Sequence, residues 1–285
     1  GIQNSYQYDA FGVQLEEKTR IEWAESTWNP VTGCYHECKY CYARRMAVRF
    51  GDFLRIDGSD IKTVKGRNGE LCVEVAYKTS NPYPEKFTPT LHMKRLRDYE
   101  KKRGRNIFVC SMADLFGDWV PDAWIDAVFE ACERATQHNY LFLTKNPDRY
   151  ISLDMSGKLL HGENVWYGLT VSDKKQAEGA MIAADMTEKA GAFLSIEPIL
   201  EDVLIDDLKT VIANFIDWVI IGAETGNRKG KVIPERKWIE NIVELCREWE
   251  KPVFMKDSLS DIWGEPLIRE WPEKLRPGSR RQYGT

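Results

Sequence analysis

Three of the seven cysteines in the chain lie close together, at Cys34, Cys38 and Cys41. Their spacing is C-x3-C-x2-C, and an aromatic residue, Tyr40, directly precedes the last of them. Three thiolates on one short loop can each bind one iron of a cubane [4Fe–4S] cluster. Because the loop offers no fourth thiolate, one iron would keep an open coordination position. An open position favours a reactive centre over a purely structural one.

A structural zinc site is the alternative interpretation of the same loop, because His36 could join the cysteines as a ligand. That arrangement requires Cys34 and His36, which one residue separates, to bind the same ion. The ligands of a zinc knuckle are usually separated by two to four residues. Structural zinc is therefore the less favoured of the two interpretations.

Composition limits the class of protein. The chain has 285 residues, 43% of them hydrophobic, and a net charge of −4, which argues against nucleic-acid binding by bulk charge but not against a local basic patch. Residues 1–17 lack the apolar core of a signal peptide, and the longest apolar run, 218–223, is too short to span a bilayer. We therefore expect a cytoplasmic protein with reduced thiols. The scattered cysteines are expected in the core: Cys72, Cys110, Cys132 and Cys246.

Short, continuously apolar runs alternate with helical patterns along most of the chain. Continuous hydrophobicity is typical of parallel strands covered on both faces. Strands are predicted at 106–111, 140–144, 165–171, 192–196, 218–221 and 252–256, with another at 27–33 leading into the cysteine loop and 85–91 as the candidate second strand. Helices are predicted at 42–50, 121–136, 173–189 and 235–250.

This alternation predicts an α/β fold, a (β/α)8 TIM-type barrel that is complete or nearly complete, with about eight βα units. An open doubly wound sheet is the alternative. We expect a barrel over residues 19–263, with an insertion after the first βα unit at about 51–84 that holds a hairpin around 71–78. Residues 1–18 would form an N-terminal extension and 264–285 a C-terminal tail, mobile and basic from residue 276.

The cysteine spacing with Tyr40 before Cys41 resembles the signature of the radical S-adenosylmethionine (SAM) enzymes, which carry it between the first strand and the first helix. The wider chain resembles a group of phage- and bacterium-encoded radical SAM-like proteins. This resemblance covers about residues 19–263 and is carried by the segments 21–23, 28–34, 111–116, 143–147 and 222–226.

The resemblance implies a defined chemistry. Cys34, Cys38 and Cys41 would bind three irons, and SAM would chelate the fourth through its amino and carboxylate groups. One electron, from a donor such as flavodoxin or ferredoxin, would cleave SAM to methionine and a 5′-deoxyadenosyl radical, which abstracts hydrogen from a substrate. Tyr40 would lie beside the adenine of SAM; packing of the loop is its alternative role.

One departure from the superfamily pattern concerns the SAM amino group. Many relatives carry a Gly-Gly-Glu motif after the second strand, and residues 87–90 (FTPT) contain nothing like it. A similar tripeptide, Gly222-Ala223-Glu224, instead follows the penultimate predicted strand. The contact to the amino group is therefore unassigned, and the role is not transferred to Glu224.

Polar residues follow the predicted strands at the ends where αβ barrels place their chemistry. The cofactor-binding candidates are Ser111, Asp114, Thr144, Lys145, Thr170 and Glu197, and the catalytic candidates are Glu224 and Lys256. By the resemblance, Thr144 would face the SAM ribose. Lys256 is expected to pair with Glu224 or Glu197, or to contact an anionic substrate. Ser172 and Asp257 are expected to cap helices.

The substrate is the least constrained part of the prediction. A nucleotide or nucleic-acid component is favoured by the phage-linked resemblance, by Arg44, Arg45 and Arg49, and by the basic tail; the net acidic charge counts against it. The glycine-rich run 222–230 is a weak phosphate-binding signal. A peptide or small metabolite remains possible, as does a non-catalytic Fe–S or zinc protein that binds nucleic acid. No second cysteine cluster indicates an auxiliary iron–sulfur domain.

Overall fold

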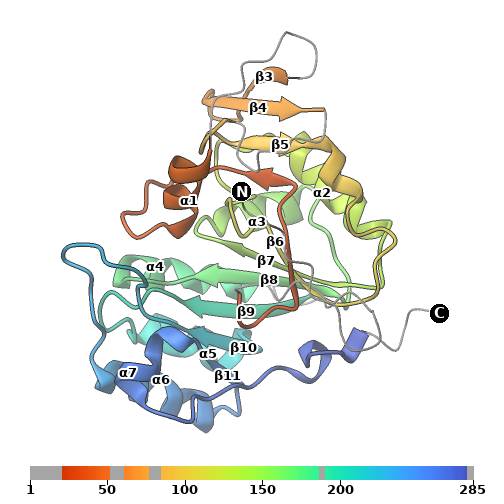
Figure 1. The fold of residues 1–285 in the computed structure, drawn as a ribbon. Helices are drawn as coiled ribbons and strands as arrows, with labels where there is room; N and C mark the ends of the chain where they lie inside the picture. The colour runs from red at the N-terminus through yellow and green to blue at the C-terminus, as the bar shows by residue number, and fades with distance from the viewer. Residues whose placement is uncertain (1–20, 52–60, 77–84, 186–189, 281–285) are drawn as a thin grey trace, which may run out of the picture.

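A parallel sheet forms the centre of the molecule (Figure 1). The computed structural model describes residues 21–51, 61–76, 85–185 and 190–280. Within them the central sheet has seven strands in the order β1-β6-β7-β8-β9-β10-β11, and each neighbouring pair is parallel. The strands are β1 (Ser26–Trp28), β6 (Asn106–Val109), β7 (Asn139–Thr144), β8 (Val165–Thr170), β9 (Gly191–Ile196), β10 (Trp218–Ile221) and β11 (Val253–Met255). The strands predicted from continuous apolar runs between 106 and 256 are thereby confirmed.

Helices link these strands and cover the outer face of the sheet. They are α1 (Tyr42–Phe50), α2 (Asp122–Glu133), α3 (Asp148–Met155), α4 (Lys174–Gly179), α5 (Asp206–Phe215), α6 (Arg236–Glu248) and α7 (Ser260–Trp263), with 3-10 turns η1 (Met93–Arg97), η2 (Ala180–Asp185), η3 (Asp257–Leu259) and η4 (Glu273–Leu275). As far as residue 185, the helix predicted at 173–189 is a short α-helix continued by a 3-10 turn, and residues 186–189 lie outside the described residues. None of the helices in the described part of the chain has the length and apolarity needed to cross a membrane.

Aromatic side chains fill the inner, concave face of the curled sheet. Trp23, just before β1, is 3% exposed, and its ring centroid lies 4.6 Å from that of Phe108, 5.9 Å from Phe193 and 6.0 Å from Trp218. A second and larger apolar cluster lies between the sheet and its helices. The sheet is therefore packed on both faces, which explains why its strands show no alternation of polar and apolar residues.

The expected second strand belongs to a different sheet. The predicted strand 27–33 is broken at Pro30, which has no N–H to donate to a ladder, and its second half forms β2 (Val31–Thr32). β2 pairs with β5 (Thr90–His92), β5 with β4 (Leu71–Val75), and β4 with β3 (Ile61–Lys65). The prediction that 85–91 supplies the second barrel strand is therefore wrong, because β6 takes the place next to β1.

The described sheet is consequently a partial TIM-like barrel rather than a complete (β/α)8 barrel: β1 and β11 are its two edges. The β3–β4 hairpin lies in the region expected as an insertion, with its turn at Asn68 and Gly69. Two parts of that region lie outside the described residues, at 52–60 and 77–84. The predicted extension at 1–18 also lies outside them.

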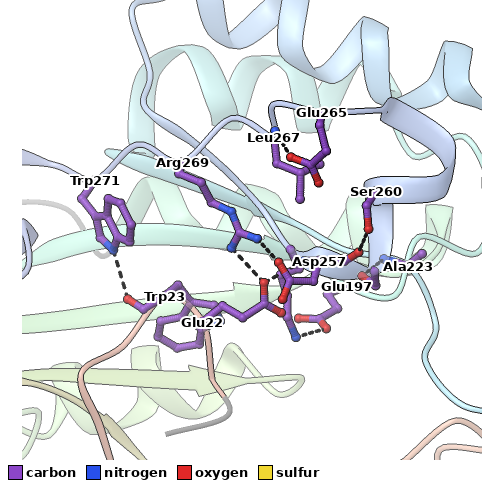
Figure 2. Close-up of polar contacts among 12 residues, drawn as sticks. Glu22, Trp23, Glu197, Ala223, Asp257, Ser260, Glu265, Leu267, Arg269 and Trp271 are labelled. Carbon is purple, nitrogen blue, oxygen red and sulfur yellow. Dashed lines mark hydrogen bonds and ion pairs between the residues drawn. The ribbon is translucent and has the colours of Figure 1, made fainter. Parts of the chain in front are cut away.

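The edge formed by β11 is paired with the chain that follows it. The amide of Met255 donates to the carbonyl of Ile268 at 2.8 Å, and the amide of Glu270 donates to the carbonyl of Val253 at 2.9 Å. Residues 268–270 thus run antiparallel to β11. Figure 2 shows how the same segment holds the residues before β1: Arg269 forms an ion pair with Glu22 at 2.8 Å, and Trp271 Nε1 donates to the Trp23 carbonyl at 3.2 Å.

The C-terminal tail is also held against the sheet as far as residue 280. The amide of Gly278 donates to Glu25 Oε1 at 3.0 Å, and Arg280 Nε donates to Asn139 Oδ1 at 2.7 Å. Leu275 is buried, and its carbonyl accepts from Asn106 Nδ2 at 2.7 Å. The expectation of a mobile tail from residue 276 is therefore wrong for residues 276–280, because polar groups at the amino ends of the strands bind this segment.

Candidate functional site

A cavity opens at the carboxyl ends of the parallel strands, with about 1040 Å³ of empty space that is partly open to solvent. The cysteine loop, the strand ends and the aromatic floor around Trp23 form its walls. Parallel strands bring residues that are far apart in sequence to one edge of a sheet. Every residue proposed from the sequence as a metal, cofactor or catalytic residue lines this cavity: Cys34, Cys38, Tyr40, Cys41, Ser111, Asp114, Thr144, Lys145, Thr170, Glu197, Glu224 and Lys256.

Gly33 fixes the start of the cysteine loop. Its amide donates to the carbonyl of Met112 at 3.0 Å, and the amide of Cys34 donates to the carbonyl of Phe87 at 3.2 Å. At Gly33 φ is +87°, and a Cβ atom would lie 2.3 Å from the carbonyl oxygen of Thr88. Only glycine combines that backbone conformation with so close an approach. The loop is therefore clamped between the β6 end and the chain before β5.

Two of the three cysteine thiols accept hydrogen bonds from backbone amides. Cys41 is the N-cap of α1, and its Sγ accepts a hydrogen bond from the amide of Arg44 at 3.3 Å. Cys34 Sγ accepts from the amide of His36 at 3.5 Å. Cys41 thus lies at the positive end of the α1 dipole, and the first turn of that helix has no acidic residue to offset it. Burial raises the pKa of Cys34 to about 12, so that thiol ionises readily only beside a bound cation.

The arrangement of the thiols bears on the type of metal centre. In the described part of the chain, no group of three or more His, Cys, Asp or Glu side chains converges as the ligands of a single ion would. Single-ion zinc sites need four ligands around one point, whereas a cubane takes each thiolate on a different iron. All three cysteines are free and face one cavity. Three free thiols on one loop are the donor set that a cubane cluster takes.

Asp114 organises one wall of the cavity. Its side chain is buried and accepts four hydrogen bonds, from His36 Nε2 at 2.7 Å, Thr144 Oγ1 at 2.7 Å, and the amides of Lys145 at 2.9 Å and Phe116 at 3.0 Å. Burial opposes ionisation of Asp114, but the hydrogen bonds, led by that from His36, hold its pKa below the usual range. Both carboxylate oxygens are therefore occupied by the protein, and Asp114 positions its neighbours.

Tyr40 lies between the cysteine loop and the strand ends. Its hydroxyl donates to Ser172 Oγ at 3.4 Å, and Lys145 Nζ lies 6.0 Å from the centre of its ring. Burial raises the pKa of Tyr40 to about 12, so the phenol is neutral. Ser172 in turn donates to the carbonyl of Glu197 at 3.2 Å. Tyr40 is thereby tied to the ends of β8 and β9.

Two ion pairs occupy the far wall. Lys256 pairs with Glu197, one of the two partners expected for it, and the side chain of Lys256 is 13% exposed. A Cβ on Gly222 would lie 3.0 Å from Cγ of Glu197 and 3.2 Å from Cδ of Lys256, so the missing side chain makes room for the pair. Glu224 is held bidentately by Arg228, through Nε at 2.6 Å and NH2 at 2.8 Å. The hydrogen bond from Arg228 is the main reason that the pKa of Glu224 is lowered.

Ser172 and Asp257 do not cap helices as predicted. The N-cap of α4 is Asp173, whose side chain accepts from the amide of Gln176 at 2.9 Å. Asp257 instead forms an ion pair with Arg269 (Figure 2). In both cases the residue next to the strand end is used for a tertiary contact, which local sequence patterns do not encode.

The structure adds Asn29 to the residues expected from the sequence. Asn29 Oδ1 accepts from Ser111 Oγ at 3.2 Å and from the amide of Met112 at 3.0 Å, which orients the Ser111 side chain. Ser195 lines the cavity beside Thr170, and no hydrogen bond from either hydroxyl to another described residue is present. The sequence indicates Ser195, a polar residue at the end of a predicted strand, whereas nothing in the sequence indicates the role of Asn29.

Comparison with known proteins places the chain in a family. Over residues 18–270 it matches the family model described as "Protein of unknown function (DUF5131)". The chain belongs to this family. The matched region contains the whole cavity. No curated protein matches the chain.

Solved structures share its fold at low sequence identity. A spore photoproduct lyase complexed with dinucleoside spore photoproduct has a TM-score of 0.50 and 10% identity, covering 90% of this DUF5131 chain and 80% of the lyase. A variant of that lyase with bound AdoMet and dinucleoside spore photoproduct has a TM-score of 0.48 at the same identity and coverage. The first likeness shows the fold: a curled, parallel αβ sheet of the partial-barrel kind.

Proposed function

We propose that this protein is a radical SAM enzyme that acts on a nucleotide or nucleic-acid component. Cys34, Cys38 and Cys41 would hold a [4Fe–4S] cluster, and SAM would occupy the cavity next to it. The observation that carries the proposal is that the three free thiols face the same cavity as the polar carboxyl ends of the strands. When bound, the cluster supplies one electron for reductive cleavage of the SAM sulfonium bond.

The residues around the cavity divide into groups that contact SAM and groups that position others. Tyr40 offers its ring to the adenine, and Lys145, 6.0 Å from that ring, carries the positive charge that suits the SAM carboxylate. Thr170 offers a hydroxyl for the ribose. Asp114 and Thr144 bind each other at 2.7 Å and so act on SAM through the residues that they orient, together with Ser111.

The substrate would meet the far wall. Glu197 presents a carboxylate and Lys256 an ammonium, side by side. The carboxylate can accept a hydrogen bond from an N–H of a nucleotide base, and the ammonium can donate one to a carbonyl of the same base. Glu224 is neutralised by Arg228 and shapes the loop that borders the cavity. The aromatic and aliphatic floor of Trp23, Phe108 and Leu143 excludes water from a reactive intermediate.

Electron entry and compartment follow from the same proposal. Glu37 and Lys39, within the cysteine loop, are exposed, so a cluster there would lie close to the surface. A small donor such as flavodoxin or ferredoxin could dock at that surface. The chemistry needs reduced thiols, as in the cytoplasm.

The proposal includes the domain limits expected from the sequence: an extension at 1–18, a barrel at 19–263 with the insertion at 51–84, and a tail at 264–285.

The nucleotide is favoured over a peptide or small metabolite by the basic residues Arg44, Arg45 and Arg49 directly after the cysteine loop. The solved relative of the same fold holds a dinucleoside photoproduct, and we extend a nucleotide-containing substrate to this chain on that basis. The net charge of −4 requires that any nucleic-acid contact be local to the cavity mouth.

Anaerobic reconstitution with iron and sulfide tests the proposal. We expect four irons and four sulfides per chain, an electron paramagnetic resonance signal after reduction, and 5′-deoxyadenosine from SAM with dithionite. Alanine at Cys34, Cys38 or Cys41 should abolish the signal and the product, whereas Cys246→Ala, at a cysteine buried in α6, should keep both. Unchanged product formation in the three loop variants, or stoichiometric zinc in place of iron, would refute it.

A further inference from the structure

Basic side chains that the chemistry proposed above does not use gather at the rim of the cavity. One group belongs to the cysteine loop and α1, where four basic residues and no acidic residue lie between positions 38 and 50: Lys39, Arg44, Arg45 and Arg49. The other belongs to the loop between β10 and α6, which carries Arg228, Lys229 and Lys231. The overall charge of the chain is negative, so this concentration is local.

Helix α1 turns Arg45 and Arg49 outward because its buried face is narrow. Ala43 and Ala47, one helical turn apart, pack against Met112 and are 5% and 0% exposed. Arg44 is partly buried and donates to the carbonyl of Cys34 at 3.3 Å, whereas Arg45 and Arg49 face solvent. Exposed apolar and aromatic side chains alternate with them: Tyr42, Met46, Val48 and Phe50. The outer face of α1 therefore combines positive charge with surfaces on which a base can stack.

The two basic segments meet at the mouth of the cavity. A Cβ atom on Gly226 would lie 3.3 Å from NH2 of Arg45, so the guanidinium of α1 rests against the loop after β10. The positive charge of Arg45 also helps to lower the pKa of Glu224, which lines the cavity. In Figure 1, α1 and the loop that follows β10 lie on the same side of the molecule. We refer to the basic side chains of these two segments together as the basic rim.

Most of the rim charges have no counter-ion among the described residues. Arg228 is engaged by Glu224. By contrast, in the described part of the chain the charged groups of Lys39, Arg45, Arg49, Lys229 and Lys231 form no hydrogen bond or ion pair. Side chains of like charge that converge without partners raise the local potential, and a polyanion lowers it. To bind a single phosphate, only one or two of these basic side chains would be needed.

We propose that this basic rim binds the phosphate backbone of a single-stranded nucleic acid, so that one nucleotide of the strand enters the cavity. The identity of the reaction in the cavity rests on the proposed function above. A strand rather than a free nucleotide fits the row of separate charges that runs from α1 to residue 231. A single strand rather than a duplex fits because the cavity is recessed and the rim offers the rings of Tyr42 and Phe50 to unpaired bases.

Binding of a fluorescent single-stranded oligodeoxynucleotide of about 20 residues, measured by anisotropy without SAM or reductant, tests the inference. R45A/R49A and K229A/K231A should each bind about tenfold more weakly, and the slope of log affinity against log salt should fall by about 1.4 for two lost phosphate contacts. K101A/R103A is the matched control, because both residues are exposed on the loop before β6, at the opposite end of the strands.

The outcomes separate this inference from its alternatives. R45K/R49K, which keeps the charge, should retain most of the affinity, while circular dichroism shows that the alanine variants are folded. Arms with an RNA strand and with a DNA duplex identify the preferred nucleic acid. No binding by the unmodified protein, tighter binding of the duplex, or a loss confined to K101A/R103A would overturn the inference. SAM cleavage is measured separately, so a failure of the radical chemistry with strand binding intact contradicts only the proposed function.

Discussion

His36 Nε2 lies 2.7 Å from Oδ2 of Asp114, and this contact joins the cysteine loop to the end of β6. Because an ionised carboxylate only accepts hydrogen bonds, the imidazole must donate through Nε2. The loop that offers three thiols is thereby anchored to the residue that also orients Thr144 and the amide of Lys145. One carboxylate connects the cysteine side of the cavity to the side formed by the end of β7.

Asp114→Asn should destabilise the protein by about 1–3 kcal/mol, because an amide nitrogen would face an N–H donor in a buried position. The pKa of Asp114 is lowered in the folded state. Its ionised form therefore contributes stability that is fully present above the unfolded pKa of about 3.9 and is lost as pH falls through the folded value. Urea unfolding of both proteins from pH 7 to pH 3 should show the difference shrinking below about pH 4. If the difference in unfolding free energy between the two proteins does not change with pH, the charge of Asp114 is not the cause of the lost stability.

Gly222→Ala should force Glu197 and Lys256 apart, since the new methyl would approach Glu197 Cγ at 3.0 Å. We expect a loss of about 1–3 kcal/mol, typical of an overpacked site. Gly179→Ala is the matched control: it lies in α4, and an added Cβ would meet nothing within 4 Å. Thermal unfolding should show a lower midpoint for the first variant only. Equal midpoints would mean that the pair shifts freely.

Lys256 and Glu197 should be energetically coupled. Lys256→Met leaves a half-buried carboxylate without its partner, and Glu197→Gln leaves the ammonium. The double variant should therefore be more stable than the sum of the single losses predicts, with a coupling free energy of about 0.5–3 kcal/mol. Chemical denaturation of the four proteins in the cycle measures this. Strictly additive losses would show that the contact contributes nothing.

Arg269→Ala should loosen the residues that precede β1. It removes the ion pairs to Glu22 and Asp257, which Figure 2 shows together. Partly exposed ion pairs contribute little individually, so we expect a global loss of only about 1 kcal/mol. Hydrogen exchange of the backbone amides at residues 21–25 should nevertheless be accelerated by the substitution more than exchange in β8 is. The reason is that local opening of residues 21–25 then breaks fewer contacts. Arg247→Ala, which removes the α6 partner of Glu270, is a control for loss of another ion pair made by the same segment.

Much of the cavity could be predicted from sequence because parallel strands end at a common edge. Thr144, Glu197 and Lys256 directly follow continuous apolar runs, and the structure brings all three to one cavity. The partners of these residues could not be predicted in the same way. Glu224 is bound by Arg228 in a loop without regular geometry, and Asn29 acts on Ser111 across 82 positions of sequence.

The missing barrel strand was unpredictable for a related reason. All three residues of β5 (TLH) are buried, as are those of a barrel strand, and the sequence of so short a strand does not say which sheet it joins. The break at Pro30 sends β2 to the second sheet, and β5 follows it as its antiparallel partner. Trp23 likewise fills the concave face from outside any strand, a contact that only the tertiary structure creates.

The antiparallel pairing of residues 268–270 with β11 has a consequence for association between copies of the chain. A parallel sheet that does not close has backbone donors and acceptors at each rim, and such rims recruit strands from other molecules. Here the chain supplies its own final strand at one rim. A version ending at residue 263 would keep every cavity residue and yet bare the β11 rim, so it should gain a tendency to assemble edge to edge.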